Sequence, residues 1–179
     1  MKTLDEEIQL DLRNFSEDIK SLIPGLISTN TMSRQRSREK LEKIGPMVLD
    51  EISRLLESKQ EQLRWEIAKA LENMASIGSI PILLKLMADE ESDIRWIAAQ
   101  GLINIGRNSL FPLLLEIIYN DSTFLNESAH HVLMELLTNK EKKDYDGLLK
   151  ALKNSKEVNG IAVIRAKEIL DSYSRSGAF

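Results

Sequence analysis

The sequence predicts an all-α fold in which helical pairs stack into a right-handed superhelix, a solenoid of about four pairs. Composition is the first observation, because eight glycines, four prolines and an aromatic share of 5% leave few turn formers and few strand-favouring residues. An internal repeat is the second, because the stretches "LRWEIAKAL" and "IRWIAAQGL" lie 31 positions apart. Fixed periods of this size are typical of solenoids.

The offset of 31 positions continues well past the matched stretches. Trp65 and Trp96 share it, and so do Pro81 and Pro112. A duplicated catalytic motif would not carry a downstream proline with it, whereas a duplicated structural unit would. The two stretches are therefore interpreted as the same first helix in consecutive repeats.

The N-terminal region, residues 1–30, is predicted to cap the stack. Residues 4–23 have the pattern of an amphipathic helix, and Thr3 and Glu6 have the spacing of a capping box. A cap is expected here because the end units of a solenoid must cover the open face of the array. The polar stretch 28–38 is predicted to be a linker.

Four helical pairs are expected to follow, over 36–58, 62–88, 93–120 and 125–154. In the second pair, apolar residues recur at helical spacing, Gly78 interrupts them, and a new helix starts near Pro81. Proline suits a first turn because the N–H that it lacks would be unbonded there anyway. The insertion "TNKEKKDYD" interrupts the fourth pair, and a terminal helix is predicted over 158–173. The whole chain, 1–179, is predicted to be one domain.

The stretch "SDIRWIAAQGLINIG" followed by "LFPLLLEIIYND" resembles a short HEAT repeat of the bacterial phycobilisome-lyase-like type. In such repeats an Arg lies near the start of the first helix, and the second helix opens around a proline. The resemblance therefore implies that Arg64, Arg95, Pro81 and Pro112 are structural repeat positions. It also implies a scaffold that binds another protein, since most members do so and only a few are enzymes.

Trp65 and Trp96 are the most conspicuous candidates for binding a partner protein. They lie off the main apolar stripe of their helices, so a stacked aromatic pair offered to a partner is one hypothesis. Packing between neighbouring repeats is the alternative, and we favour it. Arg64 and Arg95 follow acidic loops, so inter-repeat ion pairs are favoured over phosphate binding.

The second helices carry two further candidate contacts for a partner. Lys85 and Glu116 occupy equivalent positions whose charges alternate along the stack, with Asp50 before them and Lys150 after them. The next position holds Leu86 and Ile117. In HEAT arrays this second-helix wall is the concave face, so all four are candidate partner contacts, although burial between repeats is favoured for the two apolar ones.

A metal site is geometrically possible on one helix but is not predicted. Glu127, His131 and Glu135 follow one another at intervals of four, on one side of a helix, and His130 adjoins them. Two carboxylates and one imidazole along one helix rarely hold a metal, and no HExxH motif is present. The sequence also lacks cysteine and a glycine-rich phosphate loop. We expect no catalytic residues, no metal and no cofactor.

The predicted function is a non-catalytic scaffold or adaptor that binds a protein on its concave face. Two alternatives stay open: a phycobilin lyase-like or chromophore-handling protein, and a DNA-binding HEAT-like protein. A formal net charge of −4 makes a nucleic-acid partner less expected. The acidic N-terminus and short apolar stretches predict a cytoplasmic protein that does not enter a membrane. The identity of the partner and the oligomeric state are left open.

Overall fold

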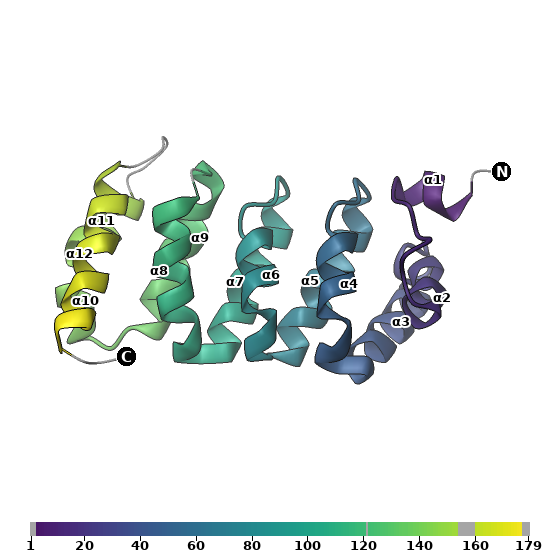
Figure 1. Ribbon diagram of the computed structural model, residues 1–179, viewed down its shortest axis with the longest axis horizontal. Helices are drawn as coiled ribbons and strands as arrows, with labels where there is room; N and C mark the ends of the chain where they lie inside the picture. Colours follow the sequence, from purple (N-terminus) through teal and green to yellow (C-terminus); the bar gives the residue numbers. More distant parts are fainter. Residues whose placement is uncertain (1–2, 121, 154–159, 177–179) are drawn as a thin grey trace.

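The computed structural model describes residues 3–120, 122–153 and 160–176, and these residues form helices and turns without a strand. The all-α solenoid that the sequence predicts is confirmed (Figure 1). A single hydrophobic core runs through the stack, from Ile8 near one end to Ala166 near the other. The repeats therefore form one continuous array.

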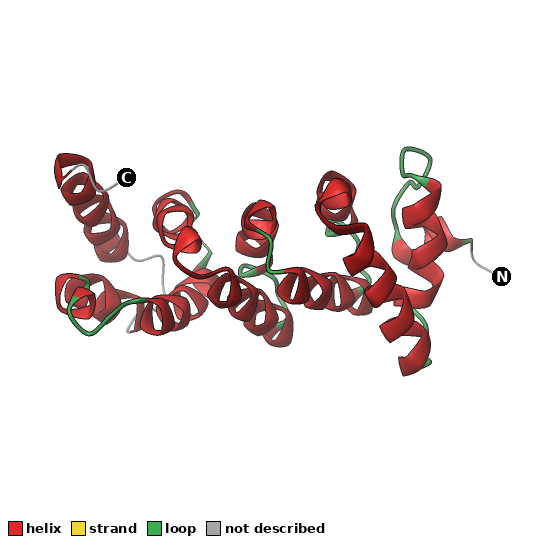
Figure 2. Cartoon of the chain, turned by 90° about the horizontal axis from the view of Figure 1, so that it is seen from below, coloured by secondary structure: helices red, strands yellow, loops and turns green. Residues whose placement is uncertain are grey.

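The helices lie in two layers (Figure 2). The first layer contains α3 (Thr31–Ile44), α5 (Glu61–Met74), α7 (Ser92–Ile105) and α9 (Thr123–Leu136). The second layer contains α4 (Leu49–Leu55), α6 (Ile80–Leu86) and α8 (Leu110–Tyr119). The N-terminal end carries α1 (Leu4–Ile8) and α2 (Glu17–Leu26), and the other end carries α10 (Glu141–Asp144), α11 (Asp146–Lys153) and α12 (Gly160–Ser176).

Each of the first three first-layer helices ends in a residue with positive φ and continues into a 3-10 turn. The residues are Gly45 (φ 73°), Ala75 (φ 43°) and Gly106 (φ 80°). Glycine adopts this conformation without steric cost, which explains two of the three positions. The 3-10 turns, Gly45–Val48, Ile77–Ser79 and Gly106–Ser109, then reverse the chain into α4, α6 and α8.

The prediction of one N-terminal helix over 4–23 is wrong. Thr3 and Glu6 do form the capping box, with the Thr3 N–H donating to the Glu6 carboxylate at 2.8 Å. However, α1 ends at Ile8 after five residues, and the next residue, Gln9, has a φ of 57°. A turn follows, and Ser16 then caps α2 by accepting from the Ile19 N–H. Polar turn formers in "QLDLRNFS" outweigh the apolar spacing.

The prediction of a linker over 28–38 is also wrong, because α3 begins at Thr31. The Asn30 side chain caps this helix by accepting from the N–H groups of Met32 and Ser33. The basic side chains are used in packing, because Arg34 and Arg38 both pair with Glu66 of α5, at 3.0 and 2.6 Å. The first helical pair therefore starts at residue 31 and not at 36.

One arginine in each of the first three repeats binds the loop that precedes its own helix. Nη1 of Arg34 donates to the Ser28 carbonyl oxygen at 2.8 Å. Nη1 of Arg64 donates to the Ser58 carbonyl oxygen at 3.1 Å. Nη1 of Arg95 donates to the Asp89 carbonyl oxygen at 2.7 Å. Each bond spans six residues, so the arginine that the repeat pattern identifies anchors the start of the first-layer helix.

The loop side chains at the same places make a second recurring bond. In each loop a side-chain oxygen accepts from the backbone N–H two residues further on, which shapes the entry to the first-layer helix. These acceptors are Ser28, Ser58, Asp89 and Asn120.

Arg64 also forms an ion pair in which both side chains are buried. Its Nε lies 2.8 Å from Oδ2 of Asp89, and the two side chains are 7% and 8% exposed. Glu90 lies 3.3 Å away and completes the carboxylate environment. The hydrogen bond to Asp89 raises the pKa of Arg64 further above its ordinary value, which keeps the guanidinium charged. Asp89 belongs to the next loop, so this pair joins two repeats.

The end of the stack differs from the predicted pair over 125–154. α11 packs beside α9, while α12 packs against both α8 and α11. Figure 2 shows that α12 lies in the same layer as α4, α6 and α8. The sequence predicted that the helix which is α11 would occupy this position. The insertion forms α10, whose Glu141 binds Arg107 at 2.5 Å and accepts from the Thr138 N–H at 2.9 Å. Of the predicted terminal helix, residues 158 and 159 lie outside the described part.

The segment Ser92–Tyr119 is long and apolar enough to cross a membrane, judged by length and composition alone. In the structure it is two helices, α7 and α8, which reverse direction after Gly106. Both contribute side chains to the core. Core helices pass the same test of length and composition, and we interpret these two as core helices.

The buried pair of Arg64 and Asp89 gives a prediction about stability. Asp89→Asn keeps an oxygen that can cap the loop but leaves Arg64 without its main counter-charge. The free energy of unfolding should fall by about 2 to 3 kcal/mol, since loss of one partner strands a buried charge. Urea denaturation measures the change. The exposed Glu57→Gln is the control and should stay within about 0.5 kcal/mol of the parent; equal stability of the two variants would contradict the role of the pair.

The contact between Glu141 and Arg107 gives a prediction about pH. Hydrogen bonds from Arg107 and Thr138 lower the pKa of Glu141 from 4.5 to about 2. The folded state therefore binds this proton more weakly than the unfolded state, so the stabilisation is complete above pH 4.5 and is lost as the pH falls towards 2. Glu141→Gln does not titrate, so its unfolding free energy should fall less than that of the parent between pH 5 and pH 3 in denaturant titrations. Parallel losses in both proteins would show that Glu141 contributes nothing.

Candidate functional site

The apolar second-helix positions are not available to a partner. Leu86 and Ile117 are each 2% exposed and belong to the core between repeats. Their assignment as partner contacts is wrong, because they are buried between repeats, which is the alternative that the sequence favoured. Lys85 is exposed, whereas Glu116 is half-buried and accepts a hydrogen bond from Asn120 at 2.6 Å. Lys85 and Glu116 form no ion pair with each other, so the alternating charges do not make a ladder.

The two tryptophans have different environments although they occupy the same repeat position. Trp65 is half-buried and packs against the core, as expected for a residue between repeats. Trp96 is 56% exposed. The favoured hypothesis of packing therefore describes Trp65 and is wrong for Trp96, whose side chain lies at the surface of the first layer.

Trp96 is held in place by a residue of the next repeat. Its ring stacks on His131 of α9, with 4.5 Å between ring centroids and 22° between the planes. Nε2 of His131 lies 2.9 Å from Nε2 of Gln100, one turn after Trp96 on α7. His131 is therefore both stacked and bonded, which leaves its ring little rotamer freedom. Trp96 is thus exposed while one face of its ring rests on a side chain that is held in place.

A cation–π contact between Arg95 and Phe124 joins the same two helices as this stack. The guanidinium carbon of Arg95 lies 4.5 Å from the centre of the Phe124 ring, at the distance of a cation–π contact. The same guanidinium donates to the carbonyl oxygens of Asp89 and Glu90 at 2.7 and 2.9 Å. Phe124 is 47% exposed and Met134 on the same helix is 37% exposed. We call Trp96, Phe124, His131 and Met134 the α7–α9 surface.

A groove of ≈ 580 Å³ lies at the α7–α9 surface. Asp93, Trp96 and Ala99 line it from α7, and Glu127 and Met134 line it from α9. Both histidines and Arg95 also line it. Burial lowers the pKa of His130, and the nearby Lys153 lowers it further, so this imidazole is neutral near pH 7. The groove combines apolar and aromatic walls with two carboxylates.

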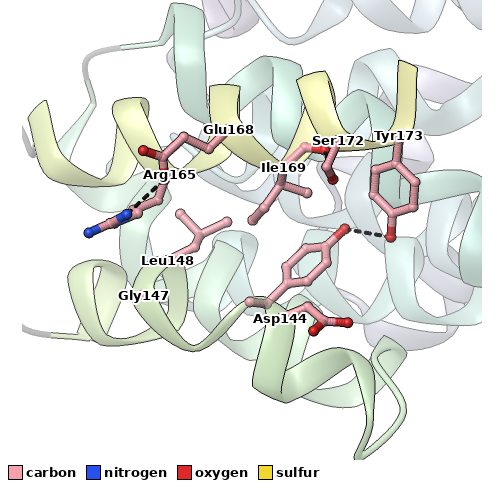
Figure 3. Close-up of a pocket in the computed structure, with 9 residues that line it drawn as sticks. Asp144, Gly147, Leu148, Arg165, Glu168, Ile169, Ser172 and Tyr173 are labelled. Carbon is pink, nitrogen blue, oxygen red and sulfur yellow. Dashed lines mark hydrogen bonds and ion pairs between the residues drawn. The ribbon is translucent and has the colours of Figure 1, made fainter. Parts of the chain in front are cut away.

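A second hollow of ≈ 570 Å³ lies between α11 and α12 (Figure 3). Tyr145 is buried there and its hydroxyl donates to the hydroxyl of Tyr173 at 3.1 Å. Burial raises the pKa of Tyr145 well above its ordinary value, and the bond to Tyr173 raises it further, so the phenol stays protonated. Arg165 is paired with Glu168 at 2.8 Å. These two pairs join polar groups of the hollow to one another, which suits a structural junction between helices.

The residues of the possible metal site do not come together. Within residues 3–120, 122–153 and 160–176, no group of three or more His, Asp or Glu side chains is arranged to hold a metal ion. His131 instead contacts Trp96 and Gln100. Glu127 lies in the groove, and Glu135 is exposed on α9 but does not line the groove.

Gln100, Phe124 and Met134 were missed by the sequence reasoning. A signal for the central contact was present, because Trp96 and His131 are separated by one repeat of 31 positions plus one helical turn. That spacing places two side chains next to each other on adjacent first-layer helices. It was not used because His131 was considered only as a metal ligand.

Comparison with known families gives one match. Residues 19–103 match the sequence model of the family described as HEAT repeats, which covers α2 to α6 and most of α7. No curated protein and no solved structure match the chain. The match contains no finding on the phycobilisome-lyase-like subtype. Together with the stacked helical pairs of the structure, it supports a HEAT-repeat protein whose recognised repeats span residues 19–103.

Proposed function

We propose that this protein is a non-catalytic, cytoplasmic scaffold that binds a partner protein at the α7–α9 surface. HEAT repeats generally mediate protein interactions, which supports the general role. The proposal moves the binding surface from the second-helix wall, where Leu86 and Ile117 are buried, to the first layer. The observation that carries it is the exposure of Trp96, 56%, on a rigid pair of helices.

The physical reason is that such a surface binds a protein at low entropic cost. Tryptophan is prominent among residues that dominate binding energy at interfaces, because its large ring loses much contact with water when covered. The stack on His131, which Gln100 holds in place, already restricts the rotamers of Trp96. Little side-chain entropy therefore remains to be lost on binding. Phe124 and Met134 extend the apolar area around it.

Chromophore handling and DNA binding receive no comparable support. The groove at the α7–α9 surface has two carboxylates against one guanidinium, a balance that does not favour phosphate groups. In the hollow between α11 and α12, the two tyrosine hydroxyls bond each other and Arg165 pairs with Glu168. We therefore do not advance either function from the described residues.

The equivalent tryptophans provide a matched pair of variants. Trp96→Ala should leave the free energy of unfolding within about 1 kcal/mol of the parent but weaken partner binding at least tenfold, since a central anchor contributes about 2 kcal/mol or more. Trp65→Ala should do the reverse, because a packed aromatic ring is lost from the stack; a cost of about 2 kcal/mol or more is expected.

The measurement combines urea denaturation with affinity capture. Partners captured by the parent protein are identified by mass spectrometry, and their affinities are then measured with purified components for both variants. The proposal predicts a partner that is lost with Trp96→Ala and retained by folded Trp65→Ala. If every captured partner binds Trp96→Ala as tightly as the parent, the α7–α9 surface is not the binding site.

A further inference from the structure

The groove at the α7–α9 surface is lined by two carboxylates, Asp93 and Glu127, and by one guanidinium, Arg95. Asp93 precedes Trp96 by one turn of α7, and Glu127 precedes His131 by one turn of α9. Each is therefore next to one half of the stacked pair. Neither forms an ion pair with any residue that the structure describes, although the chain forms many elsewhere.

The basic groups nearby do not neutralise these carboxylates. The Arg95 guanidinium lies against the Phe124 ring and donates to the carbonyl oxygens of Asp89 and Glu90. His130 is half-buried, and burial and the nearby Lys153 lower its pKa, which favours the neutral imidazole. The one arginine of the groove is thus engaged with other groups, and the two carboxylates beside the exposed aromatic ring outnumber it.

Trp96 provides the aromatic half of a cation-binding arrangement. His131 covers one face of the indole ring, and Trp96 as a whole residue is still 56% exposed. An exposed indole face attracts cations, and tryptophan does so more strongly than the other aromatic side chains. Carboxylates beside such a ring add charge attraction and accept hydrogen bonds from the same cation.

We propose that the groove binds an arginine side chain of the partner protein, stacked on Trp96 and paired with Asp93 and Glu127. This inference rests on the proposed function and names the chemistry of the partner. A guanidinium group fits better than an ammonium group, because it is planar, stacks on aromatic rings and donates to two carboxylates at once. The net charge of −4 also favours a basic partner.

The test uses the full chain labelled with ¹⁵N and short capped peptides as probes. Gly-Arg-Gly is titrated while the indole N–H signals of both tryptophans are followed by NMR. Gly-citrulline-Gly is the uncharged control, since citrulline keeps the shape of arginine and loses its charge. The signals are assigned with Trp65→Phe and Trp96→Phe.

The arginine peptide should shift the Trp96 signal and leave the Trp65 signal in place. The citrulline peptide should bind at least tenfold more weakly. Asp93→Asn and Glu127→Gln should each weaken binding of the arginine peptide about three- to tenfold, and the exposed Asp50→Asn on α4 should not change it. Binding should also weaken between 50 and 300 mM salt, because exposed charges are screened.

Equal binding of the arginine and citrulline peptides, or a shift at Trp65 alone, would overturn the inference. So would unchanged arginine binding in the double variant Asp93→Asn, Glu127→Gln. The proposed function is tested separately by the partner itself. If Trp96→Ala abolishes partner binding while the arginine peptide leaves Trp96 unaffected, the scaffold stands and the arginine pocket falls.

Discussion

A single hydrogen bond recurs at the start of three consecutive repeats and anchors the first-layer helices α3, α5 and α7. Arg34, Arg64 and Arg95 each donate to a carbonyl oxygen six residues earlier, in the loop that enters the helix. A carbonyl group in a tight loop between repeats needs a donor, and the arginine supplies one. Because the bond is the same each time, the first-layer helices follow one another in a constant register.

That register brings the candidate site together. Residues separated by one repeat and one helical turn lie side by side, which is how Trp96 reaches His131 and orders an exposed ring. The buried pair of Arg64 and Asp89 strengthens the same junction one repeat earlier. At Arg95 the loop position that corresponds to Asp89 is Asn120, and the guanidinium contacts the Phe124 ring.

The middle of the fold could be predicted from sequence because the repeat is most regular there. Pro81, Pro112 and the offset of 31 positions located α5 to α8 within a few residues. The ends could not be predicted in the same way, because tertiary contacts override local pattern. The polar stretch 28–38 looks like a linker until Arg34 and Arg38 find Glu66, which is 1% exposed. At the other end, α12 packs against α8 after an insertion whose Glu141 contacts Arg107, and no periodicity reveals either contact.

The candidate site was predictable only in part. Sequence pattern singled out Trp65 and Trp96 but treated them alike, because they occupy the same repeat position. Their difference depends on neighbours from other helices, which a single repeat unit does not contain. The next equivalent position after Trp65 is Trp96, and the next after Trp96 is the charged Glu127. The resulting asymmetry leaves one of two similar residues exposed and the other packed against the core.

The asymmetry of the two tryptophans is the central claim, and fluorescence quenching of single-tryptophan variants tests it most directly. Trp65→Phe leaves only Trp96, and Trp96→Phe leaves only Trp65. With acrylamide as the quencher, Trp96 should be quenched several-fold more strongly than Trp65 and should emit at longer wavelength. Equal quenching of the two residues, or stronger quenching of Trp65, would contradict the account.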